Sequence, residues 1–360
     1  MNLKIILQQL TEHYKQKKPF VLYAHPEGDT VEVLLQENTV KYTSEKFDEQ
    51  GIVMAPFKYE GQTICIPFKA SQQLSCDLSE AFQNQGKIKP KTVELDSKTI
   101  EKEEHMRLVS KALKAINRKH IHKVVVSRKK EVPIEHIDFS SLVPRLLRLY
   151  PTAFRYVWYH PETGLWCGAT PEVLLVTQGG SFTTMALAGT KNIADQAEPD
   201  WTPKELNEQQ VVTDVMSNCL QKVTSVLRVS KPYTHEAGSL AHLRTDITGM
   251  LKNKKTTLTT ITAALHPTPA VCGTPLKEAT DFIVDNEGYD REYYTGFIGS
   301  INDKDSRSCL YVNLRCMKLE DDKAYLYVGG GITFDSQPED EWEETQNKLQ
   351  TMLQVLQPML

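Results

Sequence analysis

Short apolar runs separated by turn residues make up most of the first ninety residues. The runs at 20–24, 31–35 and 51–57 are rich in β-branched and aromatic side chains, and Gly, Pro and Asp lie between them. Such runs are typical of β-strands, because branched and aromatic side chains pack well on a pleated surface. The pattern therefore predicts that this part of the chain is mostly strands.

The apolar spacing changes to that of a helix in the stretch DSKTIEKEEHMRLVSKALKAINRK, where apolar residues from Met106 to Ile116 recur every three or four positions. Closely spaced strands with grouped helices follow, which favours an α+β fold with antiparallel sheets over a doubly wound parallel sheet. Further helices are predicted near 139–149, over about 204–228 and from 339 to the end, and strands from 123 and at 153–159, 165–169, 173–177, 295–301, 309–319 and 324–328.

Composition and charge place the chain among globular proteins. Of its 360 residues, 40% are hydrophobic and 24% are charged, which allows one large core or two ordinary ones. The formal net charge of −4 gives no overall attraction to nucleic acid or to an anionic membrane.

The sequence also indicates in which cellular compartment the protein is expected. The amino terminus mixes Lys, Glu and Gln among its apolar residues, and no window reaches the roughly 18 apolar residues that span a bilayer. We therefore expect neither a signal peptide nor a membrane helix. The seven cysteines are scattered without a CxxC pair, which fits a reducing cytoplasm.

The segment YVGGGITFDSQPEDEWEETQNKLQ joins a glycine-ended strand to a helix. Ser336 and Glu339 have the spacing of a capping box, so the helix is predicted to open at Ser336. Glu341, Glu344 and Lys348 then fall on one helical face. This stripe is either a solvated surface or part of a site, and spacing alone favours the surface.

A second acidic helix start occurs in WTPKELNEQQVV, where Thr202, Pro203 and Glu205 match an N-cap, a first-turn proline and a capping-box acid. Capping leaves Glu208 and Glu344 as the carboxylates without a local role. Two carboxylates from separate helices, completed by water and an anionic ligand, would suit Mg²⁺, a hard cation that seldom takes an all-protein site. The spacing does not determine whether they meet.

Lys123 opens the apolar run KVVVSRKK. Three consecutive valines indicate a central strand, with Lys123, Val125 and Ser127 on one face. Lys123 is either a strand-end lysine whose amine reaches water, which spacing alone favours, or a buried group with a catalytic task. The basic residues at 128–130 lack the interleaved aromatics of a nucleic-acid site.

Two further charged residues stand among apolar neighbours. Glu172, in GLWCGATPEVLL, lies at a turn between two predicted strands, where a glutamate is usually exposed. Arg315, in YVNLRCMKL, lies within a predicted strand, where an unpaired guanidinium would be costly. We therefore expect Arg315 to meet an anion, either a protein carboxylate or a ligand.

Eight motifs, in this order, resemble those of the chorismate-utilising enzymes, which include isochorismate, salicylate, anthranilate and aminodeoxychorismate synthases. The motifs, spread over residues 123–348, are HKVVVSR, GATPEVLL, MALAGTK, KELNEQQ, LHPTPAVCG, DREYYTGFIG, VNLRC and GGGITFDSQPEDEWEET. The resemblance implies one chorismate-binding domain over 1–360, with 1–95 as a variable amino-terminal part and 96–360 as the motif-bearing core. The implied fold is that of anthranilate synthase component I: two antiparallel sheets packed as a sandwich with flanking helices.

The resemblance also implies a role for each candidate residue. Lys123 would be the base that activates water, and Glu172 the acid on the opposite side of the ring. The implied Mg²⁺ ligands are Glu208 and Glu344, with Glu205 and Glu341 as secondary acids. The implied substrate contacts are Gly189, Thr190, His266, Tyr294, Arg315, Gly330 and Lys348, with the glycines offering backbone N–H groups to an anion.

Two positions, Ala188 and Lys123, narrow the range of reactions that the resemblance implies. Ala188 stands where aminodeoxychorismate synthases of the usual type carry a nucleophilic lysine, so covalent capture of the ring is not expected. Anthranilate synthases generally lack a lysine at the position of Lys123. The resemblance thus implies an isochorismate synthase that adds water and feeds menaquinone or siderophore synthesis. Salicylate synthase, which goes on to eliminate pyruvate, is the alternative; an inactive chorismate-binding subunit is a third reading.

The resemblance also implies which partners the protein has and in which form it occurs. The expected partner is chorismate, with no nucleic acid, no membrane and no obligatory amidotransferase subunit, and the expected form is a cytoplasmic monomer. One departure is Gln209, which follows Glu208 where many relatives have a histidine. This change could alter the groups that surround the metal.

Overall fold

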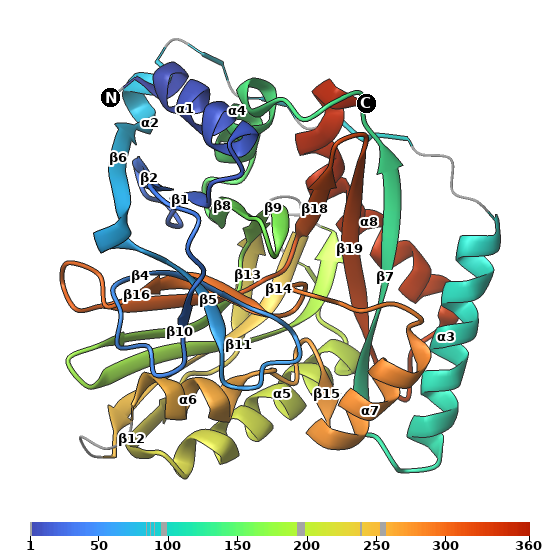
Figure 1. Ribbon diagram of the computed structural model, residues 1–360. Coiled ribbons are helices and arrows are strands. Elements are labelled where there is room, and N and C mark those ends of the chain that lie inside the picture. Colours follow the sequence, from blue (N-terminus) through green and yellow to red (C-terminus); the bar gives the residue numbers. More distant parts are fainter. Residues whose placement is uncertain are drawn as a thin grey trace.

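Two large β-sheets form the centre of the molecule, and their strands pair antiparallel. Helices cover the outer faces (Figure 1). The computed structural model describes residues 2–83, 85–86, 88–89, 91–94, 99–192, 199–237, 240–252 and 257–360, with the backbone alone at 190, 192, 204, 237 and 240. This architecture confirms the predicted α+β fold with two antiparallel sheets and flanking helices.

The first sheet has nine strands in the order β15-β7-β19-β18-β9-β8-β1-β2-β6. Its longest pairing joins β7 to β19, with Val125 opposite Gly331 and Ser127 opposite Gly329. The lysine-bearing strand therefore lies beside the glycine strand. The bounds are β15 Gly273–Thr274, β7 Lys123–Pro133, β19 Lys323–Ile332, β18 Cys316–Glu320, β9 Gly164–Thr170, β8 Phe154–His160, β1 Phe20–Ala24, β2 Thr30–Gln36 and β6 Ser71–Asp77.

The second sheet has ten strands: β13 pairs with β14 outside the path β12-β14-β11-β10-β17-β16-β4-β5-β3. The amino-terminal strands contribute to both sheets, since β1, β2 and β6 extend the first and β3, β4 and β5 the second. The bounds are β12 Thr224–Val229, β13 Tyr233–Ala237, β14 Leu240–Leu251, β11 Ser181–Asn192, β10 Val173–Gln178, β17 Ser308–Val312, β16 Phe297–Ile301, β4 Gly51–Ala55, β5 Thr63–Pro67 and β3 Tyr42–Ser44.

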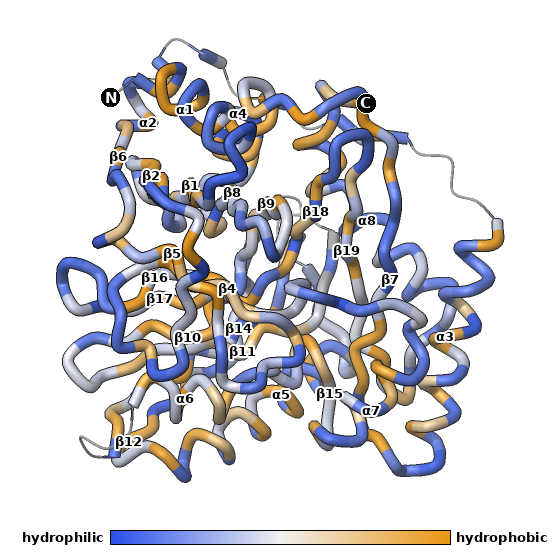
Figure 2. The backbone as a smooth tube through the Cα atoms, in the orientation of Figure 1, coloured by the Kyte–Doolittle hydropathy of each residue, from blue (hydrophilic) through white to orange (hydrophobic). Residues whose placement is uncertain are grey.

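The core is divided into layers. One apolar cluster, which includes Trp158 and Ile298, lies between the two sheets. A second packs α1, α4 and α8 on the first sheet, and a third packs α5 and α6 on the second. Apolar and polar residues alternate along α3, as its amphipathic pattern predicts (Figure 2). The helices are α1 Leu3–Lys15, α2 Leu78–Ala81, α3 Thr99–Asn117, α4 Phe139–Leu149, α5 Pro203–Gln221, α6 Leu258–Leu265, α7 Leu276–Asn286 and α8 Pro338–Leu356. Among the described helices none combines the length and the apolar character needed to cross a membrane.

The predicted strand at 309–319 is wrong as a single element. The chain leaves the second sheet at Val312 and enters the first at Cys316, so β17 and β18 belong to different sheets. Arg315 lies in the crossing, with a φ of 47° that no regular strand has. Both strands are buried on the two sides, which is why their apolar run gives no sign of the crossing.

Helix ends were predicted with mixed success. The capping box of Thr202 and Glu205, with Pro203 in the first turn, is confirmed. The box at Ser336 is wrong, because α8 starts at Pro338 and the Ser336 hydroxyl accepts a hydrogen bond from the Thr333 N–H. The predicted helix at 204–228 ends at Gln221 and gives way to β12, a segment rich in β-branched residues. Helix α1 was not predicted.

A buried ion pair fixes β7 against the end of α7. Arg291 Nη2 lies 2.5 Å from Glu287 Oε1, and their side chains are 1% and 0% exposed. The same guanidinium donates to the carbonyl of Val125, and Glu287 accepts from the N–H of Ser127. Because each charge satisfies backbone groups of β7, the pair holds the strand that Lys123 opens.

Replacing Arg291 with Leu should lower the free energy of unfolding by about 3–5 kcal/mol, because Glu287 would stay buried without a partner. Lys277→Met is the matched control: its pair with Asp281 has the same spacing but is 81% and 58% exposed, so a loss within about 0.5 kcal/mol is expected. Urea denaturation measures both changes. Equal losses would contradict the account.

Candidate active site

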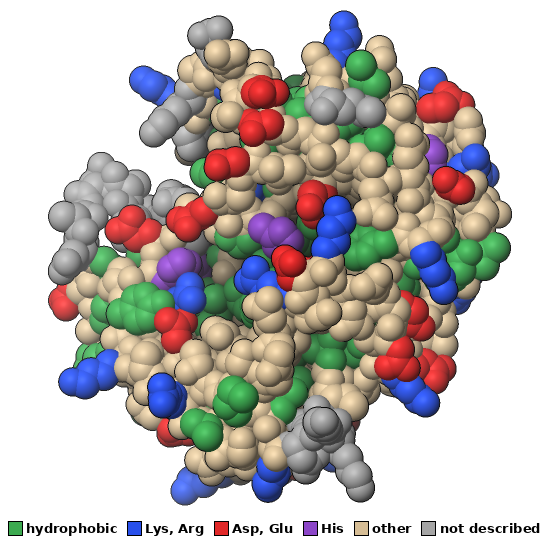
Figure 3. All heavy atoms as spheres, turned by 90° about the vertical axis from the view of Figure 1, so that its left-hand side faces the viewer, with side chains coloured by type: hydrophobic (Ala, Val, Ile, Leu, Met, Phe, Trp, Pro, Cys, Tyr) green, Lys and Arg blue, Asp and Glu red, His purple; other side chains and the backbone are tan. Residues whose placement is uncertain are grey.

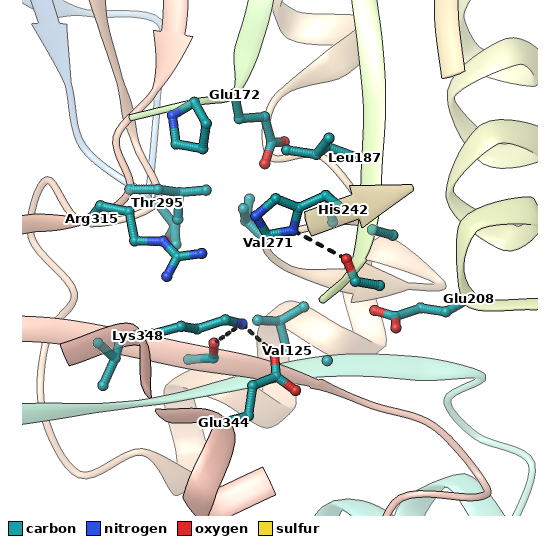
Figure 4. A pocket seen from close by; sticks show the side chains of 18 of the residues that line it. Val125, Glu172, Leu187, Glu208, His242, Val271, Thr295, Arg315, Glu344 and Lys348 are labelled. Carbon is teal, nitrogen blue, oxygen red and sulfur yellow. Dashed lines mark hydrogen bonds and ion pairs between the residues drawn. The ribbon is translucent and has the colours of Figure 1, made fainter. Parts of the chain in front are cut away.

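A cavity opens where β7 and β19 of the first sheet face β11 and β14 of the second, and α5 and α8 contribute side chains to its wall (Figure 4). Its charged lining residues come from four segments that are far apart in the sequence. The polar and charged side chains that line it are Glu172, Glu205, Glu208, His242, Tyr294, Thr295, Arg315, Glu341, Glu344 and Lys348.

Glu172 is a buried carboxyl group, although it follows a turn. Its residue is 3% exposed, and Figure 4 shows its side chain reaching into the cavity. Burial raises its pKa from 4.5 to about 8, against the opposing effects of Lys123, the nearby Thr268 hydroxyl, Arg315 and Lys348. The carboxyl group is therefore largely protonated at neutral pH, as a proton donor must be.

Lys123 is paired rather than exposed. Its Nζ lies 2.8 Å from Glu208 Oε1, and the lysine side chain is 2% exposed. The alternative of a strand-end lysine reaching water is therefore wrong. Lys123 is not itself a lining residue, but it lies beside one: a Cβ at Gly331 would be 3.0 Å from its Cε and 2.6 Å from Glu208 Oε1. Any other residue at this position would push the ends of these two side chains aside.

The acidic face of α8 points into the cavity and not into solvent. Glu341, Glu344 and Lys348 all line it, so the solvated-surface alternative is wrong. Lys348 Nζ lies 2.5 Å from Glu344 Oε1 and donates to the carbonyl of Gly329. Gly329 and Gly331 line the cavity, but Gly330 between them does not. A Cβ on Gly330 would meet Glu341 Oε2 at 3.0 Å.

Helix α5 presents two acids, Glu208, which pairs with Lys123, and Glu205, which caps the helix. Glu205 accepts hydrogen bonds from the backbone N–H and the hydroxyl of Thr202 at 2.8 and 2.6 Å. Burial raises its pKa, but these bonds outweigh burial and hold the pKa below its usual value. Both bonds end on Oε2, so the cap leaves Oε1 of Glu205 unused. Gln209, the departure noted above, donates to the carbonyl of Ala186 and to Thr245, and thereby ties α5 to the second sheet.

Arg315 lines the cavity, and the expectation that it meets an anion stays a prediction. Its Nη1 is buried and has no hydrogen-bond partner among the described residues. Burial lowers the pKa of the guanidinium, which remains charged at neutral pH. Tyr294 lies in the same wall and is 3% exposed. The cavity therefore holds a cation that lacks a protein carboxylate at ion-pair distance within the described chain.

Of three further predicted substrate contacts, His266, Gly189 and Thr190, the structure places only Gly189 in the cavity wall within the part of the chain that it describes. His266 does not line the cavity; its Nε2 lies 3.2 Å from the Phe57 carbonyl and its ring packs on Phe297, so the structure does not support this contact. Gly189 lines the cavity, and its φ of 67° with Glu205 Cβ 3.1 Å from an added Cβ requires glycine. The side chain of Thr190 lies outside the described part of the chain.

His242 was missed by the sequence reasoning. It lines the cavity, and its Nδ1 lies 3.1 Å from the Gly189 carbonyl. Burial, with Arg315 and Lys348, lowers its pKa to about 3, so the ring is neutral. A single histidine in the strand segment AHLRTDITG has no spacing signal, and only the pairing of β14 with β11 brings it to Gly189.

The carboxylate oxygens in the cavity decide whether Mg²⁺ could be held there. Glu208 and Glu344 line one cavity from two helices and offer only oxygen ligands, as a hard cation requires. Among the described residues there is no group of three or more His, Cys, Asp or Glu side chains placed to hold a metal. Two carboxylates with water and substrate oxygens fit the way Mg²⁺ is usually bound, so the residues fit the ion.

Charge on the surface is mixed. On the face shown in Figure 3, acidic, basic and histidine side chains are interspersed around a hollow. A nucleic-acid site would instead gather basic residues into a stripe. On this face the mixed charges therefore favour a small ligand over a nucleic acid.

The chain matches a known protein family and is similar to known isochorismate synthases. The family model described as "Chorismate binding enzyme" matches residues 58–357. The isochorismate synthase EntC of Escherichia coli is 32% identical over 262 residues, 69% of this chain and 66% of that protein. The isochorismate synthase DhbC of Bacillus subtilis is 36% identical over 198 residues, 52% of this chain and 50% of that protein.

A solved structure supports the fold. The menaquinone-specific isochorismate synthase MenF of Escherichia coli has a TM-score of 0.76 over 95% of this chain and 89% of that one, at 23% identity. At this identity the likeness is to the fold alone.

The raised pKa of Glu172 predicts a pH-dependent stability. A carboxyl whose folded pKa is about 8 stabilises the fold fully below its unfolded value of 4.5 and loses that contribution as the pH rises through 8. Between pH 4.5 and 7.5 the wild type should lose roughly 3–4 kcal/mol relative to Glu172→Gln, which cannot ionise. Denaturation at both pH values measures the difference, with the exposed Glu339→Gln as control. A constant gap between wild type and Glu172→Gln would refute the raised pKa.

Proposed function

Because the chain belongs to the chorismate-binding enzyme family, we propose that it is an isochorismate synthase, an isomerase that converts chorismate to isochorismate. The observation that carries the proposal is the buried Glu172, whose pKa of about 8 makes it an acid at neutral pH, in the same cavity as the Lys123–Glu208 pair. An acid and an amine held on separate walls can act on two positions of one ring.

The substrate would be held by the cations of the cavity. Chorismate carries two carboxylates, and Arg315 offers a buried guanidinium nitrogen that lacks a partner within the described chain. Tyr294, Lys348, Gly329 and Gly331 line the same space. These contacts would fix the ring with C2 toward Lys123 and C4 toward Glu172.

The reaction would then be an exchange of hydroxyl groups. Lys123, which is paired as an ammonium in the structure, would first give a proton to solvent; the free amine then takes a proton from a water that attacks C2, and the ring double bonds shift. Glu172 gives its proton to the C4 oxygen, so that the hydroxyl leaves as water. One water is consumed and one is released. The proton gained by Lys123 must afterwards return to Glu172, through the cavity or solvent, to restore the starting state.

Magnesium is part of the proposal. A Mg²⁺ ion held by Glu208 and Glu344 would supply positive charge to the ring carboxylate of the substrate. Glu341 is buried beside Gly330 and could serve the same ion, whereas Glu205 has one carboxylate oxygen, Oε2, occupied by its helix cap. The two glutamates thus position the ring carboxylate, and Lys123 and Glu172 carry out the proton transfers.

The runner-up is a salicylate synthase. The same groups would form isochorismate first, and loss of pyruvate would follow in the same cavity. The MenF of Escherichia coli named above is menaquinone-specific, and either menaquinone or siderophore synthesis would suit an isochorismate synthase here.

A product analysis tests the proposal. Pure protein incubated with chorismate and Mg²⁺ should yield isochorismate, separated by chromatography from salicylate and pyruvate. Salicylate with an equal amount of pyruvate would favour the runner-up, and unchanged chorismate would refute both.

The role of Lys123 has a matched control on the same strand. Lys123→Gln should lower kcat by about 10²–10⁴-fold, because it removes the base. Lys129→Gln, at an exposed position of β7, should retain wild-type turnover. Turnover by Lys123→Gln at the rate of the control would contradict the assignment, provided that circular dichroism shows both variants folded.

A further inference from the structure

Each glutamate proposed as a metal ligand has an ammonium group as its direct partner. Glu208 Oε1 lies 2.8 Å from Lys123 Nζ, and Glu344 Oε1 lies 2.5 Å from Lys348 Nζ. The lysine side chains are only 2% and 14% exposed. The pairs are therefore not surface ion pairs that water would screen, and each carboxylate is neutralised from within the cavity wall.

An ammonium group and a divalent cation compete for such an oxygen. Mg²⁺ takes a carboxylate oxygen at about 2.0–2.1 Å, which brings it within a few ångströms of an ammonium bound to the same oxygen. Like charges at this separation repel strongly in a cavity that excludes water. The cation can therefore use these oxygens fully only if the ammonium groups withdraw.

We propose that Lys123 and Lys348 are counter-ions for which the divalent cation substitutes, so that cation binding releases both ammonium groups into the cavity. The exchange is balanced, since two single positive charges leave the carboxylates and one double charge takes their place. This inference rests on the metal role in the proposed function. It gives that role a consequence: binding of the cation frees the Lys123 ammonium to lose its proton, as the base role requires, and frees Lys348 for the anionic substrate.

The local geometry supports such an exchange. Lys348 lines the cavity that Glu172 occupies, and Lys123 lies directly behind its wall, beside Gly331 and Glu208, which both line it. Gly331 has no side chain to separate Lys123 from Glu208, since its added Cβ would lie 2.6 Å from the carboxylate oxygen. Lys348 has a second partner, the carbonyl of Gly329, to which its ammonium can stay bound after it leaves Glu344.

Cation affinity without substrate tests the inference. Titration calorimetry with MgCl₂ in the absence of chorismate should show about tenfold tighter binding to Lys348→Met and to Lys123→Met than to the wild type, because no ammonium then competes. Lys348→Arg keeps a cationic partner for Glu344 and should bind like the wild type. Circular dichroism verifies the fold, and either methionine variant alone suffices for the comparison.

A control separates competition from general electrostatics. Lys191→Met removes the same charge from the cavity rim, where Lys191 lies 3.7 Å from Glu205 and pairs with neither Glu208 nor Glu344. Its Mg²⁺ affinity should change by less than about twofold. Equal or weaker binding by both methionine variants, or equal tightening by Lys191→Met, would overturn the inference even if the wild type makes isochorismate. Failure of the proposed function appears separately, as absence of product in the chorismate assay.

Discussion

Charge withdrawn from water must be neutralised or paired, and this constraint organises the cavity. Glu172 is neutralised by holding its proton, with a pKa of about 8. Lys123 is paired with Glu208 and Lys348 with Glu344. Arg315 lines the cavity and presents a buried guanidinium nitrogen without a partner among the described residues, which makes it the natural place for an anionic substrate. The chemistry proposed for the cavity follows from these protonation and pairing states.

The fold provides this arrangement by joining two sheets at one cavity. The chain crosses from β17 to β18 at Arg315, and the pairing of β7 with β19 sets Val125 opposite Gly331. Helix α5 on the second sheet and α8 beside the first then supply the acids from opposite walls. The buried pair of Arg291 and Glu287 holds β7 in place behind them.

Much of the fold, and the membership of the cavity, could be predicted from local pattern and motif order. The Thr202 cap and the stripe of Glu341, Glu344 and Lys348 are encoded within a few residues, so spacing reveals them. The crossing at Arg315 and the position of His242 depend on contacts between distant strands, which no local spacing records. The burial of Glu172 is a tertiary property as well, since the turn that carries it would ordinarily be exposed. The catalytic roles themselves remain predictions.

The central claim is that Lys123 and Glu172 act on two different oxygens, one entering at C2 and one leaving from C4. Turnover of chorismate in H₂¹⁸O, analysed by mass spectrometry, tests this most directly. The account predicts that each isochorismate molecule formed carries one ¹⁸O at C2, because the new hydroxyl comes from water. Isochorismate that retains only the original oxygen would show internal transfer of the hydroxyl group and would contradict the account.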